Sequence, residues 1–593
     1  YFFDLFGAGL GAMLIIALLF VASPQASLVL LVLLPLTGSV LMATTLASRL
    51  PLGIAQLAWF ALLAFGIPQA HLDLRISEYK GLSQALQVVD SRILHQSSSP
   101  LGLITVVDSP TVPIRHAPGL SFNTRHIPPQ QMAVFTDADG MSAITRYDGS
   151  PGSVAYLGDL TAALPFQLLE QPDVLILGAG TGNDVLLSLY HGAGRVDAVE
   201  LNPQMSALVA QTYADFAGHV YDDPRVTVHT DEARGFVARN SGKYDLIQIG
   251  LLDSFGASGA GVQALNESYI YTVEALREYL ADLEPGGLLA ITRWIRMPPR
   301  DSVKLLATAI EALRQSGVSE PGRRIAMVRS WNTSTLLVRN GDFASPEVER
   351  IREFARSRSF DTAYFPGMGA GEANRFNRLS RPYIYDAAIA LLGDAPGEFS
   401  ERYKFYVEPA TDDRPYFFHF FRWRTLPEVM SLRKAGGAGL IEWGYLVLVA
   451  TFMQAAVLGL VLILLPLSLV RHAWPAGTGR QFGFYFLLLG LAFLFVEMAF
   501  IQKFILFLSN PLYSVAVVLS GFLLFAGLGS ALSERFAQRL PWQVVSPVTI
   551  AVAAIALLAL IYIKLLPIVF AAFFGFPDAV RIALSLALIA PLA

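Results

Sequence analysis

Asp173-Val-Leu-Ile-Leu-Gly-Ala-Gly-Thr-Gly182 encodes a short apolar strand that runs directly into a loop with three glycines, and a helix is predicted to open near Asn183. Glycines let a backbone approach a ligand closely, and the N–H groups at a helix N-terminus are free to bind it. The next predicted strand ends in Glu200, 22 positions after Gly178, where a carboxylate can accept both ribose hydroxyls of a nucleoside. This order of elements predicts a nucleoside-binding α/β unit, although the third glycine comes too early for the dinucleotide fingerprint.

The middle of the chain has the composition of a soluble protein. Residues 101–147 alternate apolar and polar side chains, and Asp139-Gly140 is a hairpin signal, so we expect a small antiparallel β domain there. From Asp173 onward strands and helices alternate, which predicts a parallel sheet in an α/β fold. The predicted domains are a β-rich N-terminal domain over 72–150, a Rossmann-like nucleoside-binding catalytic domain over 151–345, and an α-rich extension over 346–437 that returns to the membrane.

Apolar residues are concentrated at the two ends of the chain. The 593 residues are 54% hydrophobic and only 15% charged, whereas a typical soluble domain is about 25% charged. About 20 apolar residues span a bilayer, so these ends predict seven or eight transmembrane helices, about three in 1–70 and four to five in 438–593. The chain begins without Met and stops inside an apolar run, so we expect further spans in the natural protein. The apolar runs are 5–22, 26–48, 51–68, 440–470, 481–508, 511–533 and 541–566, and another begins at 580.

Residue counts exclude several classes of function. Lys and Arg number 43 against 47 Asp and Glu, so the chain has no basic excess with which to bind nucleic acid. Because the chain has no cysteine, disulfides, thiolate nucleophiles and Cys-ligated metals are excluded. The nine histidines are scattered without HxxxH spacing, so we expect no metal site.

Two apolar segments contain closely spaced small residues, Gly7-Ala-Gly-Leu-Gly-Ala12 near one end and Ala526-Gly-Leu-Gly-Ser530 near the other. Small residues at this spacing let helix backbones approach closely. The similarity of the two segments also fits two related halves of a bundle, as in transporters. We favour independent use of small residues, because no longer repeat accompanies them.

Glu497 lies deep inside the predicted span over residues 481–508. Ionisable side chains at that depth are costly and usually face a partner or a cavity. Glu497 is therefore expected to be paired, protonated or on a polar path, and it is a candidate substrate residue.

Further motifs follow the glycine loop in order. Together they resemble the spermidine synthase (polyamine aminopropyltransferase) family, whose core is a class I methyltransferase-like Rossmann fold. The resemblance covers roughly residues 75–340 and is densest over 173–294. The apolar flanks, with Thr411-Asp-Asp-Arg-Pro-Tyr-Phe-Phe418, resemble the membrane-integrated bacterial relatives of these synthases. The motifs are Tyr221-Asp-Asp-Pro-Arg-Val226, Thr230-Asp-Glu-Ala-Arg-Gly-Phe236, Tyr244-Asp-Leu-Ile-Gln-Ile249 and Leu283-Glu-Pro-Gly-Gly287.

The resemblance implies roles for individual acids. Glu200 matches the family acid that holds the ribose, and Glu232 matches the acid on the adenine side. Asp253 matches the second aspartate of the family's D-x-x-D-P signature and is the candidate catalytic base. The other predicted contacts of the cosubstrate are Gly178, Gly180, Thr181, Gly182, Asp231 and Gly250.

Two positions depart from the family pattern at the amine end of the site. The aspartate of the family's glycine loop is Thr181 here, and the first aspartate of D-x-x-D is Gly250, while the family's proline is Ser254. A nearby aspartate repels the carboxylate of intact S-adenosylmethionine by about 1–4 kcal/mol. Thr181 and Gly250 therefore favour intact S-adenosylmethionine, although the family uses the decarboxylated form. Asp184 is a candidate substitute for the base near the tail.

Two further features have competing interpretations. Tyr156 and Asp159 lie where the family has a substrate-side Tyr-x-Glu segment, and Asp159 fits a substrate contact as well as it fits a plain helix cap. Asp412-Asp413-Arg414 precedes an aromatic cluster, which fits a solvated loop beside an interfacial aromatic belt as well as an active-site role.

The resemblance implies a membrane-integrated transferase that uses S-adenosylmethionine or decarboxylated S-adenosylmethionine. It would pass an aminopropyl-type group to an amine or a membrane-associated acceptor and release methylthioadenosine. A methyltransferase that uses S-adenosylmethionine and a non-catalytic transporter or sensor that retains nucleoside binding are the alternatives. Since a soluble polyamine needs no helical anchor, the apolar spans suggest an amphipathic small-molecule acceptor and contact with membrane lipids. Homo-oligomerisation is left open.

The charges in short loops give conflicting signals about membrane orientation. Arg471 and Arg535 lie opposite the soluble part, which by the positive-inside rule puts that part outside the cytoplasm. Arg75 and Lys80 flank the soluble part, and adenosyl cosubstrates are cytosolic. We therefore expect a multi-pass protein of the bacterial inner (plasma) membrane with a cytoplasmic soluble part.

Overall fold

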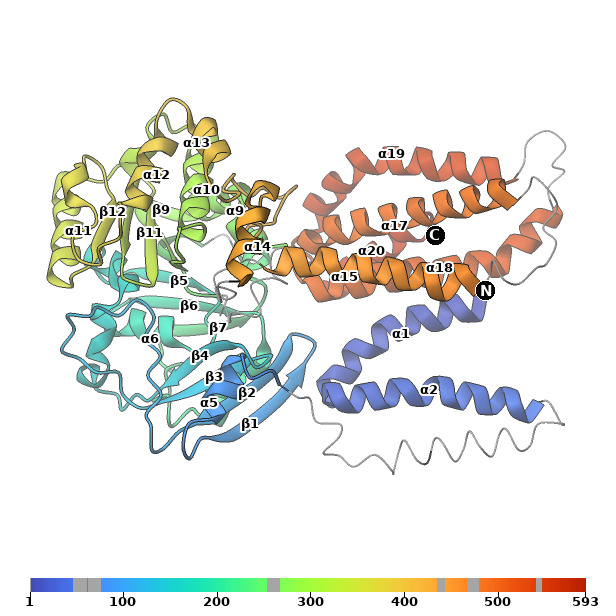
Figure 1. Cartoon of the computed structure of the whole chain (residues 1–593), viewed down its shortest axis with the longest axis horizontal. Coiled ribbons are helices and arrows are strands. Elements are labelled where there is room, and N and C mark those ends of the chain that lie inside the picture. The colour runs from blue at the N-terminus through green and yellow to red at the C-terminus, as the bar shows by residue number, and fades with distance from the viewer. Residues whose placement is uncertain are drawn as a thin grey trace. The chain divides into compact units, whose positions relative to one another are not determined.

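The chain is described from a computed structural model (Figure 1). The described residues are 2–45, 61, 76–240, 242–252, 267–434, 443–466, 479–539 and 547–593. They divide into two compact units, one made of residues 1–76, 97–103 and 471–593 and the other of residues 77–96 and 104–470. Asp253, Ser254 and the predicted span over 51–68, apart from residue 61, lie outside the described residues.

Four strands form a small sheet in the part of the chain where alternating side chains predict strands. β3 lies antiparallel to both β2 and β4. Asp137 and Ala138 adopt positive φ of 51° and 64° in the turn between β3 and β4, next to the predicted Asp139-Gly140 signal. The order is β1 (Arg92–Ser99), β2 (Gly102–Asp108), β3 (Gln131–Thr136) and β4 (Gly140–Thr145).

Eight strands form the second sheet, in the order β12-β10-β11-β9-β8-β5-β6-β7. The chain runs from β5 outward to β6 and β7, then returns to the other side of β5 to form β8 and β9, and these five strands are parallel. The order therefore reverses between β5 and β8, which makes this the topological switch point where open α/β sheets bind ligands. The strands are β5 (Asp173–Leu177), β6 (Arg195–Glu200), β7 (Val226–Thr230), β8 (Tyr244–Ile249), β9 (Leu283–Trp294), β10 (Ile325–Arg329), β11 (Thr333–Arg339) and β12 (Asp361–Tyr364).

The prediction of a parallel sheet is wrong for the edge that carries β10, β11 and β12. β11 lies antiparallel to β9 and β10, and β12 lies antiparallel to β10. The hydroxyl of Ser330 accepts the N–H groups of Asn332 at 3.3 Å and Thr333 at 3.1 Å, which closes a tight turn between β10 and β11. A turn this short joins antiparallel neighbours, because a parallel crossover needs a dozen or more residues.

Helices bury both faces of the large sheet. Val174 and Ile176 of β5 lie in one hydrophobic cluster, whereas Leu175 and Leu177 lie in another, because successive side chains of a strand point to opposite faces. The first cluster includes residues of α6 (Asn183–Tyr190), α7 (Pro203–Ala207) and α11 (Ser345–Ser357). The second includes residues of α8 (Ala233–Arg239), α9 (Val273–Ala281), α10 (Asp301–Gln315) and α12 (Tyr383–Leu392). The chain also forms α5 (Gly81–Leu86), α13 (Pro396–Arg402) and α14 (Leu426–Lys434).

Long apolar helices occupy the two ends of the chain. Within the described residues, five of them are long and apolar enough to cross a membrane: α1, α15 with its continuation to Leu464, α17, α18 and α19. Their length and composition are consistent with membrane insertion. The helices are α1 (Phe2–Val21), α2 (Pro24–Thr45), α15 (Trp443–Gly459), α17 (Gly479–Leu508), α18 (Pro511–Arg539), α19 (Pro547–Phe573) and the shorter α20 (Asp578–Ile589).

The helices that carry the two small-residue segments lie against each other, since α1 packs on α18. A Cβ atom added to Gly9 would lie 2.8 Å from Leu524 Cγ, and one added to Gly527 would lie 3.3 Å from the carbonyl oxygen of Phe2. The glycines therefore let the two backbones approach closely, as predicted. This contact accounts for Gly9 and Gly527, whereas a Cβ atom on Gly7 or Gly11 would meet nothing within 4 Å.

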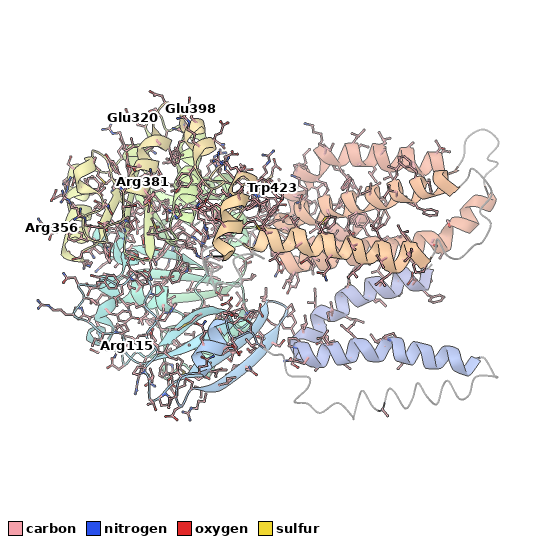
Figure 2. All side chains as sticks on the ribbon, in the orientation of Figure 1. Arg115, Glu320, Arg356, Arg381, Glu398 and Trp423 are labelled. Atoms are coloured by element: carbon pink, nitrogen blue, oxygen red, sulfur yellow. The ribbon has the colours of Figure 1, made fainter. Side chains whose placement is uncertain are left out.

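Charged side chains cover the outside of the α/β unit, and Glu320, Arg356 and Glu398 are labelled in Figure 2. Their side chains keep 66%, 73% and 65% of their exposed area. This surface contrasts with the apolar helices, where exposed residues are mostly Leu, Ile, Val and Phe.

Candidate functional site

The glycine loop closes the carboxyl end of β5 at the switch point. Gly178, Gly180 and Gly182 have φ of +84°, +52° and +83°, values that residues with a side chain rarely adopt. A Cβ atom on Gly178 would lie 1.8 Å from Leu252 Cδ2, so the segments that follow β5 and β8 approach each other closely here. The backbone geometry thus requires glycine at positions that the sequence assigns to the nucleoside site.

Glu200 is held against this loop at the end of β6. Its Oε2 accepts the N–H of Gly180 at 2.8 Å, and its Oε1 accepts the N–H of Asn202 at 2.8 Å. Burial raises the pKa of Glu200, and the backbone hydrogen bonds lower it in part. The carboxylate is therefore fixed in orientation beside the glycine loop, where a ribose-binding acid is predicted.

Asp231 and Glu232 follow β7 and are used locally to start α8. Glu232 Oε2 accepts the N–H of Gly235 at 2.7 Å and caps the helix, while burial raises the pKa of Glu232. Asp231 Oδ1 accepts the N–H of Glu232 at 2.8 Å, and Asp231 Oδ2 pairs with Arg239 at 2.5 Å. The two acids therefore lie at the carboxyl edge of the sheet, just after the strand that pairs with the strand of Glu200, and each already has a structural partner.

Tyr221 is a residue of this site that the sequence analysis did not select. Its hydroxyl donates to the carbonyl of Gly180 at 3.1 Å, and its ring lies 3.3 Å from where a Cβ of Gly182 would be. Burial raises its pKa, with further contributions from Glu200 and Asp184. In the sequence, Tyr221 is only the first residue of the motif before β7. That position does not predict its contact with the glycine loop.

Asp184, in the first turn of α6, reaches the end of β8. Gln248 Nε2 donates to Asp184 Oδ1 at 2.9 Å. A Cβ atom on Gly250 would lie 2.1 Å from Asp184 Oδ2, so the carboxylate fills the space that a side chain at Gly250 would need. Burial raises the pKa of Asp184 to about 6, and the bond from Gln248 lowers it in part. The Asp184 carboxylate therefore lies beside Gly250, where the family pattern has an acid, and its role as a base stays a prediction.

Asn183 and Tyr156 connect the small sheet to the glycine loop. Asn183 Nδ2 donates to the carbonyl of Ala143 at 2.7 Å, and Thr145 Oγ1 donates to Asn183 Oδ1 at 2.8 Å. The hydroxyl of Tyr156 lies 3.4 Å from the same Thr145 Oγ1, and Tyr156 is buried. Thr181 is also buried, and its Oγ1 accepts a hydrogen bond from Asn183 Nδ2 at 3.5 Å. β4 thus contacts Asn183, the residue that follows the glycine loop. Tyr156 contacts Thr145 of β4 and reaches the loop only through that residue.

The carboxylate of Asp159 is engaged at another place. Thr124 Oγ1 donates to Asp159 Oδ2 at 2.6 Å, His126 Nδ1 lies 3.1 Å from the same atom, and Arg358 Nε lies 3.5 Å from Oδ1. Asp159 therefore ties the segment before it to Arg358, and its role as a substrate contact stays a prediction.

Glu497 belongs to α17 and is only 7% exposed. The phenylalanines at one helical turn before and after it on that face, Phe493 and Phe500, both pack on Phe522 of α18, with ring centroids 5.9 and 5.6 Å apart. The side chain thus lies on the face of α17 that α18 covers. Among the described residues, no group of three or more His, Asp or Glu side chains is arranged to hold a metal ion.

Asp412 forms an ion pair with Arg234 of α8 and keeps 22% of its side-chain area exposed, while Asp413 and Arg414 beside it are exposed. Arg234 NH1 lies 2.5 Å from Asp412 Oδ1, and Arg234 NH2 lies 3.0 Å from Glu278 Oε1 on the other side. Thr272 also donates to Asp412 Oδ1 at 2.7 Å. The Thr411–Phe418 motif is therefore bound to α8, the helix that Glu232 caps.

Comparison with known proteins finds polyamine aminopropyltransferases among the curated relatives and spermidine synthases among the solved structures. A polyamine aminopropyltransferase of Korarchaeum cryptofilum is 26% identical over 276 residues, which cover 46% of this chain and 75% of the relative. A polyamine aminopropyltransferase of Clostridium perfringens is 30% identical over 151 residues, 25% of this chain and 50% of the relative. The crystal structure of spermidine synthase from Thermotoga maritima aligns over 52% of this chain and 86% of that chain, with 15% identity and a TM-score of 0.31.

The chain thus spans three quarters of the length of the first relative and half of the second. No family model matches it. The sequence similarity to polyamine aminopropyltransferases confirms the resemblance that the motifs indicate.

Proposed function

We propose that the α/β unit is an enzyme that transfers an aminopropyl group from decarboxylated S-adenosylmethionine to an amine and releases methylthioadenosine. The observation that carries this proposal is the position of Glu200, whose two oxygens are held by the N–H groups of Gly180 and Asn202 at the switch point. A carboxylate offers about four lone-pair positions, so acceptor capacity remains for the ribose hydroxyls. The named relatives support the same activity.

The chemistry is a displacement at carbon. The acceptor nitrogen attacks the carbon beside the sulfonium, the new N–C bond forms as the C–S bond breaks, and the electron pair leaves with sulfur as a neutral thioether. The proton of the amine passes to a base, for which we propose Asp253. Since no bond to the protein forms, the contribution of the chain is to hold the two reactants in line and to take up that proton.

The apolar helices support a further part of the proposal. Five described helices have the length and composition of membrane spans. An enzyme tethered in the inner membrane suits an acceptor that is itself amphipathic or membrane-associated, with the α/β unit on the cytoplasmic side where adenosyl cosubstrates are made.

Product analysis on the purified full chain tests the function. Decarboxylated S-adenosylmethionine and a panel of amines, from putrescine to long-chain alkylamines, should give methylthioadenosine and an aminopropylated amine in equal amounts. The Glu200→Ala variant is the matched control and should give neither. S-adenosylhomocysteine formed from intact S-adenosylmethionine would instead identify a methyltransferase, and nucleoside binding without any product would identify a transporter or sensor.

A further inference from the structure

Asp184 and Gly250 form a complementary pair across the switch point. Asp184 belongs to α6, whereas Gly250 ends β8, and the two are brought together only by the fold. The carboxylate oxygen Oδ2 lies 2.1 Å from the position of a Cβ on Gly250, so a side chain there would displace it. The acid that position 250 lacks is thus replaced by an acid from a neighbouring helix.

The second carboxylate oxygen of Asp184 is oriented by Gln248. The amide of Gln248 donates to Oδ1, and its own Oε1 accepts no hydrogen bond within the described residues. The amide nitrogen of Gln248 therefore binds Asp184 Oδ1, while Asp184 Oδ2 faces Gly250 at the end of β8. A glutamine that serves only to hold one carboxylate is expected where the direction of that carboxylate matters.

The charge of Asp184 has no counter-ion in the described part of the chain, where burial and Gln248 alone govern the pKa of its carboxyl. Besides burial, Glu200 and Asp184 both raise the pKa of the Tyr221 hydroxyl, so the charged groups that meet at Tyr221 are anionic. A half-buried carboxylate without a cation is costly, and a positively charged ligand group would relieve that cost.

We propose that Asp184 binds an ammonium group at the transfer end of the site, and that Gly250 is a specificity-determining residue because its missing side chain admits the Asp184 carboxylate. This inference rests on the proposed function and names the charge of its substrate. The ammonium belongs to the tail of decarboxylated S-adenosylmethionine or to the acceptor amine. If the ammonium belongs to the cosubstrate tail, Asp184 also repels the carboxylate of intact S-adenosylmethionine, which reverses the preference expected from Thr181 and Gly250 alone.

The test compares wild type with Asp184→Asn in the full chain. Asparagine has the same shape and can still accept the hydrogen bond from Gln248, but it carries no charge. Calorimetry with methylthioadenosine, decarboxylated S-adenosylmethionine and intact S-adenosylmethionine separates the contribution of the nucleoside to the affinity from that of the tail. We expect unchanged affinity for methylthioadenosine, which also shows that the variant is folded. Asp245→Asn, at the opposite end of β8, is the control and should leave all three affinities unchanged.

The two sources of the ammonium give different results. If Asp184 meets the cosubstrate tail, Asp184→Asn weakens decarboxylated S-adenosylmethionine about tenfold to a hundredfold and removes its advantage over the intact form. If Asp184 meets the acceptor, the cosubstrate affinities stay and the KM of the amine rises by a similar factor. Gly250→Ala should reproduce whichever effect is seen, because its Cβ displaces the same carboxylate.

The inference is overturned if Asp184→Asn changes neither the cosubstrate preference nor the KM of the amine. That result is distinct from failure of the proposed function, in which the wild-type protein binds none of the three adenosine compounds.

Discussion

The guanidinium of Arg234 donates to both carboxylate oxygens of Asp412, at 2.5 and 2.8 Å, although the two residues are 178 positions apart in the chain. Arg234 is 5% exposed and lies two residues after Glu232, the predicted acid of the adenine side. Asp412 belongs to the motif that leads toward the apolar C-terminal part. The nucleoside edge of the sheet is therefore joined through one buried ion pair to the segment that follows the α/β domain.

We expect Asp412→Ala to destabilise the full chain by about 2–4 kcal/mol, because it leaves the buried guanidinium with Glu278 as its one carboxylate partner among the described residues and with the neutral acceptors Tyr269 and Thr272. Denaturant unfolding followed by tryptophan fluorescence measures this change. Glu398→Ala is the control, since Glu398 pairs with Arg402 on the surface and is labelled in Figure 2. Exposed pairs contribute about 0–1 kcal/mol, and equal losses in both variants would contradict a structural role for the Arg234–Asp412 pair.

Glu200→Ala should reduce the affinity for methylthioadenosine by about 2–4 kcal/mol, because the ribose hydroxyls lose their acceptor and the N–H groups of Gly180 and Asn202 lose theirs. Calorimetry gives the value directly. Asp173→Asn, at the start of β5 and 42% exposed, is the control and should bind normally. Unchanged affinity in Glu200→Ala would remove Glu200 from the site.

The pKa of Asp184 predicts how stability depends on pH. Burial raises it from 3.8 to about 6, so the folded protein binds more protons than the unfolded chain between these values, and stability falls as pH rises through that window. Asp184→Asn removes the buried charge and should raise the melting temperature at pH 8 by about 2 °C. The difference from wild type should vanish near pH 4. A variant that melts lower than wild type at pH 8 would contradict a destabilising charge.

Local sequence patterns predicted the part of the site that is built locally. The glycine loop directly follows β5, and Glu200 ends the next strand, so the order of residues alone places them at one edge of a sheet. Asp184 and Gly250 could not be paired in this way, because the position of α6 over the end of β8 depends on how the sheet is wound. The partner of Asp412 was missed for the same reason. The antiparallel edge was missed because β10 and β11 are as apolar as the parallel strands, and only their tight turn distinguishes them.

The packing of α1 on α18 is tested by two glycines of the same helix. Gly9→Leu should clash with Leu524, whose Cγ lies 2.8 Å from the new Cβ, and should destabilise the contact by about 1–3 kcal/mol. Gly11→Leu is the control, since a Cβ atom at Gly11 would meet nothing within 4 Å. Thermal melts in detergent compare them. If both variants melt like wild type, the close approach of the two helices is wrong.

The last prediction concerns Glu497 in α17. It is 7% exposed and lies on the face that packs on Phe522 of α18. A charge in such surroundings is costly unless a polar group or a ligand meets it. If Glu497 is a substrate residue, Glu497→Gln should leave the melting temperature the same or higher, because it removes an ionisable group from an apolar contact. Turnover of a long-chain amine should then fall about tenfold, while the affinity for methylthioadenosine is unchanged.

The control is Gln502→Ala, which alters a polar residue of the same helix farther along. Melting temperature and turnover are measured on one preparation of each variant, so that loss of fold and loss of function are separated. A lower melting temperature with normal turnover per folded molecule would show that Glu497 serves a structural pair. Since Glu497 has no ion-pair partner among the described residues of α17, α18, α19 and α20, we expect the opposite outcome.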